Sequence, residues 1–333
     1  MPSPAMRQAM AQARVGDEQA REDPTVIALE AAAAAFVGHE EAVYLPTATM
    51  ANEIALVVLG ERGSVLLAEE AAHLLVYELG GPAWHAGLLS RPLPGSAGRL
   101  TPEQIRASVS PANGVHTPRA SVLAIENSHN SSGGTVWPYE ELASVAAAAH
   151  ELELRVHLDG ARLPNAAIAI GRSAAEIGVL FDTVTLCLSK GLGCPLGAVL
   201  AGSRALMARS RVEKHRFGGA MRQAGIVAAA GLYALEHNVE RLGDDHARAR
   251  RLAEGWKAAG LAIDLARVQT NFVQIDVRDL GLDTTEALAR IADAGVLLSA
   301  TVRPGVIRAL THLDVDDSDV DEAIDLVPRA LGV

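Results

Sequence analysis

The feature that most constrains the fold of this chain is a regular alternation of short apolar segments with longer segments of helical periodicity. The alternation predicts strands at Ala42–Leu45, Ser64–Leu67, Ser121–Ile125, Leu154–Leu158, Thr183–Leu188 and Ala198–Ala201. Between them it predicts helices at Thr25–Val37, Ala48–Leu59, Glu103–Val109, Tyr139–His150 and Arg162–Ile170. Strands that are apolar along nearly their whole length are typical of a mainly parallel sheet covered on both faces. The sequence therefore predicts an α/β domain.

The pattern changes after about Leu235. The sequence first predicts a long helix at Val239–Ala259. It then predicts a strand at Asn271–Ile275, a helix at Thr284–Ala294, two short strands near Val296 and Ile307, and a final helix at Ser318–Leu331. This mixture is typical of a small α+β domain. We expect a large domain over residues 1–237 and a small one over 238–333, a division that a chain of 333 residues can support.

The charge balance excludes some classes of partner. Lys and Arg number 29 and Asp and Glu number 40, so the net charge is −11. An acidic surface repels nucleic acids and anionic membranes. The longest apolar stretch, Ala224–Leu235, is shorter than the roughly 20 residues of a membrane span, and the N-terminus has no signal-peptide core. Cys187 and Cys194 fit no zinc or redox spacing, so we expect structural thiols in a reducing cytoplasm.

The first candidate functional residue lies in a glycine-rich segment after a predicted strand. The segment reads Asp-Thr-Val-Thr-Leu-Cys-Leu-Ser-Lys-Gly-Leu-Gly-Cys-Pro-Leu-Gly over residues 182–197, so the strand leads to Lys190. Burial makes a lysine costly as a purely structural residue, but it lowers the pKa and frees the amine as a nucleophile. The glycines would let a planar cofactor approach the backbone. The alternative is a lysine that extends to the solvent.

A carboxylate and an arginine follow another predicted strand. Asp159 ends the segment Val-His-Leu-Asp, and Arg162 lies three residues further on. Ligands of open α/β sheets bind at the carboxyl ends of strands. There a carboxylate can keep a pyridine nitrogen protonated, and an arginine can bind a carboxylate through two hydrogen bonds. The alternative is a helix-capping aspartate paired with its own arginine.

Three further features lie at strand ends. The segment 44–52, Tyr-Leu-Pro-Thr-Ala-Thr-Met-Ala-Asn, begins a helix, whose first N–H groups could bind phosphate with help from Thr47 and Thr49. His73 and His129 also follow predicted strands. A single histidine is more often structural than catalytic, but two at strand ends of one sheet favour a functional role.

Two other patterns do not match the motifs that they resemble. Residues 191–197 have Leu196 where a dinucleotide fingerprint needs its third glycine. The acidic segment 313–319 lacks the glycine of a calcium loop and is typical of a capped helix start. We therefore expect no metal.

Taken together, the chain resembles the low-specificity L-threonine aldolase family, which belongs to the β-eliminating lyase group of fold type I enzymes. The resemblance implies the aminotransferase-like fold and the cofactor pyridoxal 5′-phosphate (PLP). It extends from about Met6 to the C-terminus and rests on GDEQAREDPT (16–25), PTATMAN (46–52), the stretch 73–78, IENSHNSSGGTV (125–136), VHLDGARLPNAA (156–167), CLSKGLGCPLG (187–197), GGAMRQAG (218–225) and IRALTHLDV (307–315).

The resemblance implies roles for the residues around the cofactor ring. Lys190 corresponds to the lysine that binds PLP covalently, Asp159 to the partner of the pyridine nitrogen, and His73 to the imidazole that stacks on the ring. Arg162 and Arg308 correspond to the arginines that hold the substrate carboxylate and the ring hydroxyl.

It also implies roles at the edges of the site. His129 corresponds to a histidine proposed to act on the β-hydroxyl of the substrate, and Ala48 and Thr49 to the phosphate-binding loop. Arg222 lies on a segment that reaches the cofactor site of a neighbouring subunit, which implies a homo-oligomer, commonly a dimer of dimers. The implied reaction cleaves L-threonine, L-allo-threonine or a related 3-hydroxy amino acid to glycine and an aldehyde.

The chain departs from the family pattern at several positions. The family usually begins with an Arg-Ser-Asp-Thr stretch that this chain does not contain. Its phosphate loop usually has glycines where this chain has Ala48 and Ala51, and a glycine of positive φ tolerates alanine poorly. His215 replaces a family lysine, and residues 20–21 replace a Tyr-Gly pair. These departures concern substrate preference and affinity for PLP.

Two alternatives to the aldolase reaction stay open at this stage. One keeps PLP but catalyses β-elimination, racemisation or cleavage of another substrate such as phenylserine. The other is a degenerate homologue that binds or assembles without catalysis. The joint presence of Lys190, Asp159, His73, His129 and both arginines argues against the second.

Overall fold

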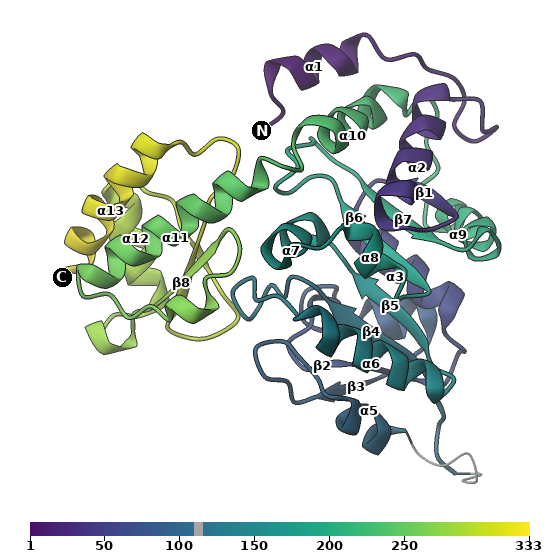
Figure 1. Cartoon of the computed structure of the whole chain (residues 1–333), viewed down its shortest axis with the longest axis horizontal. Coiled ribbons are helices and arrows are strands. Elements are labelled where there is room, and N and C mark those ends of the chain that lie inside the picture. The colour runs from purple at the N-terminus through teal and green to yellow at the C-terminus, as the bar shows by residue number, and fades with distance from the viewer. Residues whose placement is uncertain (110–115) are drawn as a thin grey trace.

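The computed structural model describes residues 1–109 and 116–333. Its main sheet has seven strands in the order β1-β7-β6-β5-β4-β2-β3 (Figure 1). The strands are β1 (Glu41–Leu45), β2 (Val65–Glu69), β3 (Leu89–Leu93), β4 (Ala120–Glu126), β5 (Arg155–Asp159), β6 (Thr183–Cys187) and β7 (Ala198–Gly202). The six strands predicted from the sequence are all present, within a few residues of the expected bounds.

One strand of this sheet runs against the others. β7 pairs antiparallel with both β1 and β6, whereas the remaining neighbours are parallel. Residues 188–197 form the connection from β6 to β7, which is too short for the crossover that a parallel pair needs. The edge strand β3 was not predicted, because it contains Pro92 and is largely exposed. Proline is tolerated at a sheet edge, where one N–H needs no partner.

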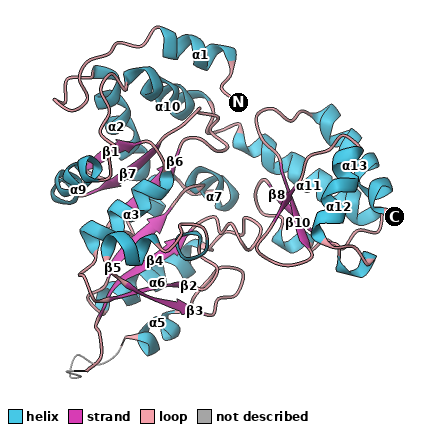
Figure 2. Cartoon of the chain, turned by 180° about the vertical axis from the view of Figure 1, so that it is seen from behind, coloured by secondary structure: helices cyan, strands magenta, loops and turns pink. Residues whose placement is uncertain are grey.

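Helices cover both faces of the sheet (Figure 2). The helices of the large domain are α1 (Pro4–Ala11), α2 (Pro24–Val37), α3 (Ala48–Leu59), α4 (His73–Val76), the π-helix η1 (Pro82–Ala86), α5 (Pro102–Ser108), α6 (Tyr139–Glu151), α7 (Leu163–Ile170), α8 (Ala174–Gly178), α9 (Arg204–Arg216) and α10 (Gly225–His237). Alternate strand residues point to two separate apolar clusters, one around Leu29, Leu158 and Leu186 and the other around Ile54 and Leu66. The structure thus confirms the doubly covered α/β sheet.

The C-terminal part forms a smaller α+β unit beside the main sheet (Figure 1). It contains the helices α11 (Leu242–Ala258), α12 (Thr284–Asp293) and α13 (Asp317–Leu331), the short 3-10 helices η2 (Leu265–Arg267) and η3 (Arg278–Leu280), and the antiparallel sheet β8-β10-β9 of β8 (Phe272–Asp276), β9 (Ser299–Ala300) and β10 (Val306–Leu310). The strand predicted near Val296 begins at Ser299 instead. This unit has its own core around Trp256, Ile275 and Val327, and we propose the domain boundary in the turn between α10 and α11.

The register of the parallel strands brings their carboxyl ends to one edge of the sheet. Glu126 at the end of β4 pairs with Asp159 at the end of β5, and Asp159 pairs with Thr185 near the end of β6. The turn that contains Lys190 leaves the sheet at the same edge. In the part of the chain that the structure describes, no helix has the length and apolar character that crossing a membrane requires.

Candidate active site

Lys190 lies in a turn that its glycines make possible. The backbone N–H of Gly193 donates to the Lys190 carbonyl at 2.9 Å, and Gly193 has a φ of +79°, a conformation that favours glycine. The Lys190 amine has no hydrogen bond or ion pair to any residue that the structure describes. The sequence contains only two other lysines. Lys214 is buried against Glu18, and Lys257 is exposed on α11. Lys190 is therefore the lysine available for chemistry at the sheet edge.

A cavity opens beside this lysine. It has a volume of about 310 Å³. Its lining comes from the part of the chain that carries the main sheet (Arg162, Lys190, Gly191 and Gly193, with Met1) and from the C-terminal α+β unit (Asn271, Leu310, His312, Leu313 and Asp314). The motif 307–315 therefore lies against the glycine-rich turn, although more than a hundred residues separate them in sequence. An arginine and an unpaired amine facing one cavity suit a small carboxylate-bearing ligand.

Asp159 is held in a buried network. Its side chain accepts hydrogen bonds from Asn52 at 3.0 Å and from the Ala161 N–H at 3.1 Å, and the residue is 2% exposed. The Asn52 amide also donates to Glu78 at 2.9 Å, and its oxygen contacts His157 at 3.1 Å. These partners fix the orientation of the Asp159 carboxylate.

His73 joins the same network. Its Nδ1 lies 2.8 Å from Glu78 Oε1, and ligand-type atoms of His73, Glu78 and Asp159 all lie within 4.8 Å of one another. Burial by itself would lower the pKa of His73, but the hydrogen bond to Glu78 and the charges of Asp159 and Glu126 outweigh it and raise the pKa. The structure thus brings two of the predicted residues, His73 and Asp159, together.

Arg162 and Arg308 converge on one aromatic ring. Their guanidinium carbons lie 4.6 and 5.4 Å from the centre of the Phe272 ring. Burial and then the positive charge of Arg308 lower the pKa of Arg162 to about 10. Arg308 is oriented by Asn130, whose side-chain oxygen accepts from it at 2.9 Å. Two neighbouring guanidinium groups that repel each other form a site that an added carboxylate would stabilise.

The N-terminus of α3 can bind an anion. Thr47 caps the helix by accepting from the Met50 N–H, and the first N–H groups of a helix have no partner within it. Ala48 and Ala51, where the family has glycines, are helical and absent from the positive-φ residues that the structure describes. Alanine therefore causes no backbone strain at these two positions.

We predict that Ala51→Gly destabilises the protein and does not tighten PLP binding. Ala51 is 0% exposed inside α3, and glycine within a helix costs roughly 0.5–1 kcal/mol relative to alanine. Denaturant unfolding and a PLP binding titration would check the two parts. A clear gain in PLP affinity would show instead that alanine strains the loop.

Among the predicted site residues, Lys190 and Arg162 line the cavity of about 310 Å³, whereas His73, Asp159, Arg308, Ala48 and Thr49 do not. Two further predicted residues have their side chains bonded elsewhere. His129 is 1% exposed, and its Nε2 lies 3.1 Å from Glu69. Arg222 lies on the surface, where it donates to Asp17 at 2.7 Å. As placed in this chain, neither side chain lines the cavity beside Lys190.

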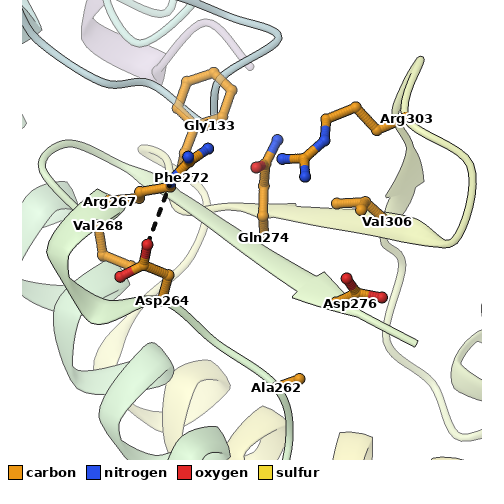
Figure 3. Close-up of a pocket in the computed structure, with 10 residues that line it drawn as sticks. All are labelled: Gly133, Ala262, Asp264, Arg267, Val268, Phe272, Gln274, Asp276, Arg303 and Val306. Carbon is orange, nitrogen blue, oxygen red and sulfur yellow. Dashed lines mark ion pairs between the residues drawn. The ribbon is translucent and has the colours of Figure 1, made fainter. Parts of the chain in front are cut away.

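A second cavity of about 260 Å³ lies on the small domain. Figure 3 shows Arg303 and Gln274 at one side of it and the Arg267–Asp264 ion pair, 3.4 Å long, at the other. Phe272 also lines this cavity, but none of the predicted functional residues does. The cavity beside Lys190 is therefore the better candidate for the active site.

Comparison with known proteins identifies the family. The family model described as beta-eliminating lyase matches residues 1–279. The chain belongs to this family. It is 40% identical to the low specificity L-threonine aldolase of Escherichia coli (strain K12) over 323 residues, which cover 96% of this chain and 93% of that one. It therefore belongs to the low-specificity L-threonine aldolases within this family.

Two more comparisons bear on reaction and fold. The chain is 30% identical to "Alanine racemase TOXG" of Cochliobolus carbonum, over 98% of this chain and 84% of that one. A Leishmania major threonine aldolase structure superposes with a TM-score of 0.84 at 18% identity, over 99% of this chain and 96% of that one. The second comparison confirms the expected fold type I.

The beta-eliminating lyases of this group depend on PLP, and the donors in the structure fit that cofactor. Lys190 offers an unpaired amine, Asp159 a carboxylate for a protonated ring nitrogen, and α3 free N–H groups for a phosphate.

Several residues of the candidate site were not predicted from the sequence. Asn52 and Glu78 both lie inside quoted motifs, but only the fold brings them beside Asp159. Glu126 accepts from the His73 and Asn130 N–H groups at 2.8 and 2.7 Å. Its position at the end of a predicted strand was the one feature of the sequence that could have indicated a role in the site.

Proposed function

We propose that the protein cleaves L-threonine, L-allo-threonine or a related 3-hydroxy amino acid into glycine and an aldehyde. The observation that carries the proposal is the convergence of Lys190 and Arg162 on one cavity, in a chain that is 40% identical to a low specificity L-threonine aldolase. When bound, PLP accepts the electron pair that is released as the Cα–Cβ bond breaks.

The residues of the chain position the substrate. Arg162 and Arg308 hold its carboxylate, as their shared position over Phe272 supports. A substrate held at both its carboxylate and its amine has only a narrow range of orientations for its Cα–Cβ bond. This restriction lowers the entropic cost of reaching the reactive orientation.

The β-hydroxyl proton must move as the bond breaks. His73 is the imidazole that we propose for this step, because its Nδ1 is held by Glu78 and its side chain keeps 27% exposure. His129 was expected to act here from the family resemblance. Since its ring is buried, we propose that it orients Glu69 and the loop of residues 129–135, whose ends are bridged.

The deciding experiment measures acetaldehyde released from L-threonine by purified protein saturated with PLP. We expect stoichiometric glycine and acetaldehyde. A protein that binds PLP to Lys190 but releases neither product would contradict the aldolase assignment.

Racemisation is the second candidate, and the similarity to the alanine racemase of Cochliobolus carbonum favours it. Both reactions need the same lysine and carboxylate. Incubation with L-alanine in deuterated water distinguishes them, because a racemase produces deuterated D-alanine and an aldolase alone leaves the enantiomer unchanged. Pyruvate formed from serine would point to β-elimination.

We predict that Arg308→Gln raises the KM for L-threonine by roughly 10- to 100-fold, because a hydrogen bond to a charged group contributes about 1.5–3 kcal/mol. Arg303→Gln is the matched control, since this arginine lies at the second cavity. Steady-state kinetics of both variants would check the prediction. Equal effects would show that Arg308 does not hold the substrate.

We further propose that the protein works in the cytoplasm as a homo-oligomer, in which Arg222 reaches the site of a neighbouring subunit. The exposure of its side chain, 66%, supports a role outside its own chain. Sedimentation of the wild type and of Arg222→Ala would test this.

A further inference from the structure

Glu53 lies in the middle of α3 without the partner that a buried carboxylate needs. The helix is otherwise largely apolar, and Glu53 is 2% exposed. Neither of its side-chain oxygens forms a hydrogen bond to another donor among the described residues. A buried, ionised carboxylate in such surroundings is strongly unfavourable.

The group that faces Glu53 is another carboxyl, that of Glu78. The two side chains are within hydrogen-bond reach, and Glu78 is the one charged group that acts on Glu53 among the described residues. The helices α9 and η1 and the strands of the main sheet also pack on α3. Strand β5 brings Asp159 and His157 to Asn52, the neighbour of Glu53 in α3, but Glu78 is the charged group that raises the pKa of Glu53. Gly81 makes room for the pair, since a Cβ atom there would lie 2.1 Å from Glu53 Oε1.

The hydrogen bonds show which of the two carboxyls keeps the proton. Burial raises the pKa of Glu78 as well as that of Glu53. Only Glu78 has donors that oppose this effect, because its Oε1 accepts from Asn52 and lies 2.8 Å from His73 Nδ1, and these contacts favour its ionised form. Glu78 Oε2 has no donor among the described residues. A proton on Glu53 would supply that donor and remove the charge from Glu53. Burial, followed by the charge of Glu78, raises the pKa of Glu53 to about 8.

We propose that Glu53 is a positioning residue that holds a proton at neutral pH and donates a hydrogen bond to Glu78, which in turn holds His73 beside Asp159. Glu53, Glu78 and His73 then form a chain that shares protons, with Asn52 joining it to Asp159. The role of His73 rests on the proposed function, but the protonation of Glu53 does not.

Infrared spectroscopy of the protein, with and without PLP, tests the protonation directly. At pH 7 almost all other carboxyls are ionised, so we expect a neutral-carboxyl band that Glu53→Gln removes. The matched control is Glu286→Gln, which removes an exposed carboxylate on α12. This variant should retain the band. The wild-type band should disappear as the pH rises through about 8. No band, or a band that survives in Glu53→Gln, would overturn the proposal.

Stability provides a second readout that needs neither cofactor nor substrate. The pKa of Glu53 is raised in the fold from its ordinary 4.5 to about 8. Its contribution to stability is therefore complete below about pH 4.5 and is lost as the pH rises through about 8. Glu53→Gln should remove this loss, so that its Tm exceeds the wild-type Tm most clearly above pH 8. An identical pH dependence of Tm in both proteins would contradict the proposal.

The link to His73 is tested by the absorbance of bound PLP. We expect the wild-type spectrum to change near pH 8, as Glu53 loses its proton. Glu53→Gln keeps a donor for Glu78, so it should show the wild-type spectrum at pH 7 and no change near pH 8. Glu53→Leu removes the donor, and it should change the spectrum at pH 7 and weaken PLP binding several-fold. If the Gln and Leu variants have the same spectra, Glu53 does not position His73.

Discussion

The Lys190→Ala variant should lose turnover of L-threonine by at least about 10³-fold, the order expected when a nucleophile is removed. The lysine at the sheet edge is the amine that attaches PLP in our proposal, and no other lysine can replace it. Lys214 is buried against Glu18 and Lys257 lies on α11. Acetaldehyde release from L-threonine by the PLP-saturated variant is the measurement.

The matched control for this variant is Lys257→Ala, which removes an exposed lysine of the small domain. It should retain wild-type turnover. Borohydride reduction followed by peptide mass analysis should place the cofactor on the peptide of Lys190 in the wild type and nowhere in Lys190→Ala. Substantial turnover by Lys190→Ala would contradict both the covalent attachment and the proposed reaction.

The second large effect is expected for Asp159→Asn, whose kcat/KM should fall by roughly 10- to 100-fold. The substitution removes the negative charge that would keep the ring nitrogen protonated, and a hydrogen bond to a charged group is worth about 1.5–3 kcal/mol. In the wild type, the Asn52 amide donates to the Asp159 carboxylate at 3.0 Å. The substitution also places a second amide opposite this donor.

Asp182→Asn is the control for this prediction. Asp182 precedes β6, at the opposite end from Lys190, and pairs with Arg155. Its replacement should leave kcat/KM close to the wild-type value once both proteins are shown to be folded by their Tm. If Asp159→Asn performs as well as this control, another group must act on the ring nitrogen.

The sequence supported the fold because its main strands are short and mostly apolar. The strands β4, β5 and β6 could be predicted from local pattern, since every residue in them except Arg155 is buried. The edge strand β3 could not, because exposure and Pro92 remove the apolar signal. The antiparallel direction of β7 follows only from the length of its connection.

The site was predictable where a residue follows its own strand, as Asp159 and Lys190 do. Side-chain direction was not predictable. His129 also follows a strand, yet Glu69 and Glu126 surround its ring and Gly98 closes over it, since a Cβ atom at Gly98 would lie 2.2 Å from the ring. The partnership of Asn52 with Asp159 joins positions 107 residues apart, and only the folded chain shows it.

The scarcity of lysines has a practical consequence for attaching the protein to a surface. Reagents that couple to side-chain amines find one of the three shielded by Glu18 and another in the turn at the sheet edge. With the cofactor occupying that second amine, coupling would concentrate at Lys257 on the small domain. Coupling through side chains would then favour one point of attachment without any engineered tag.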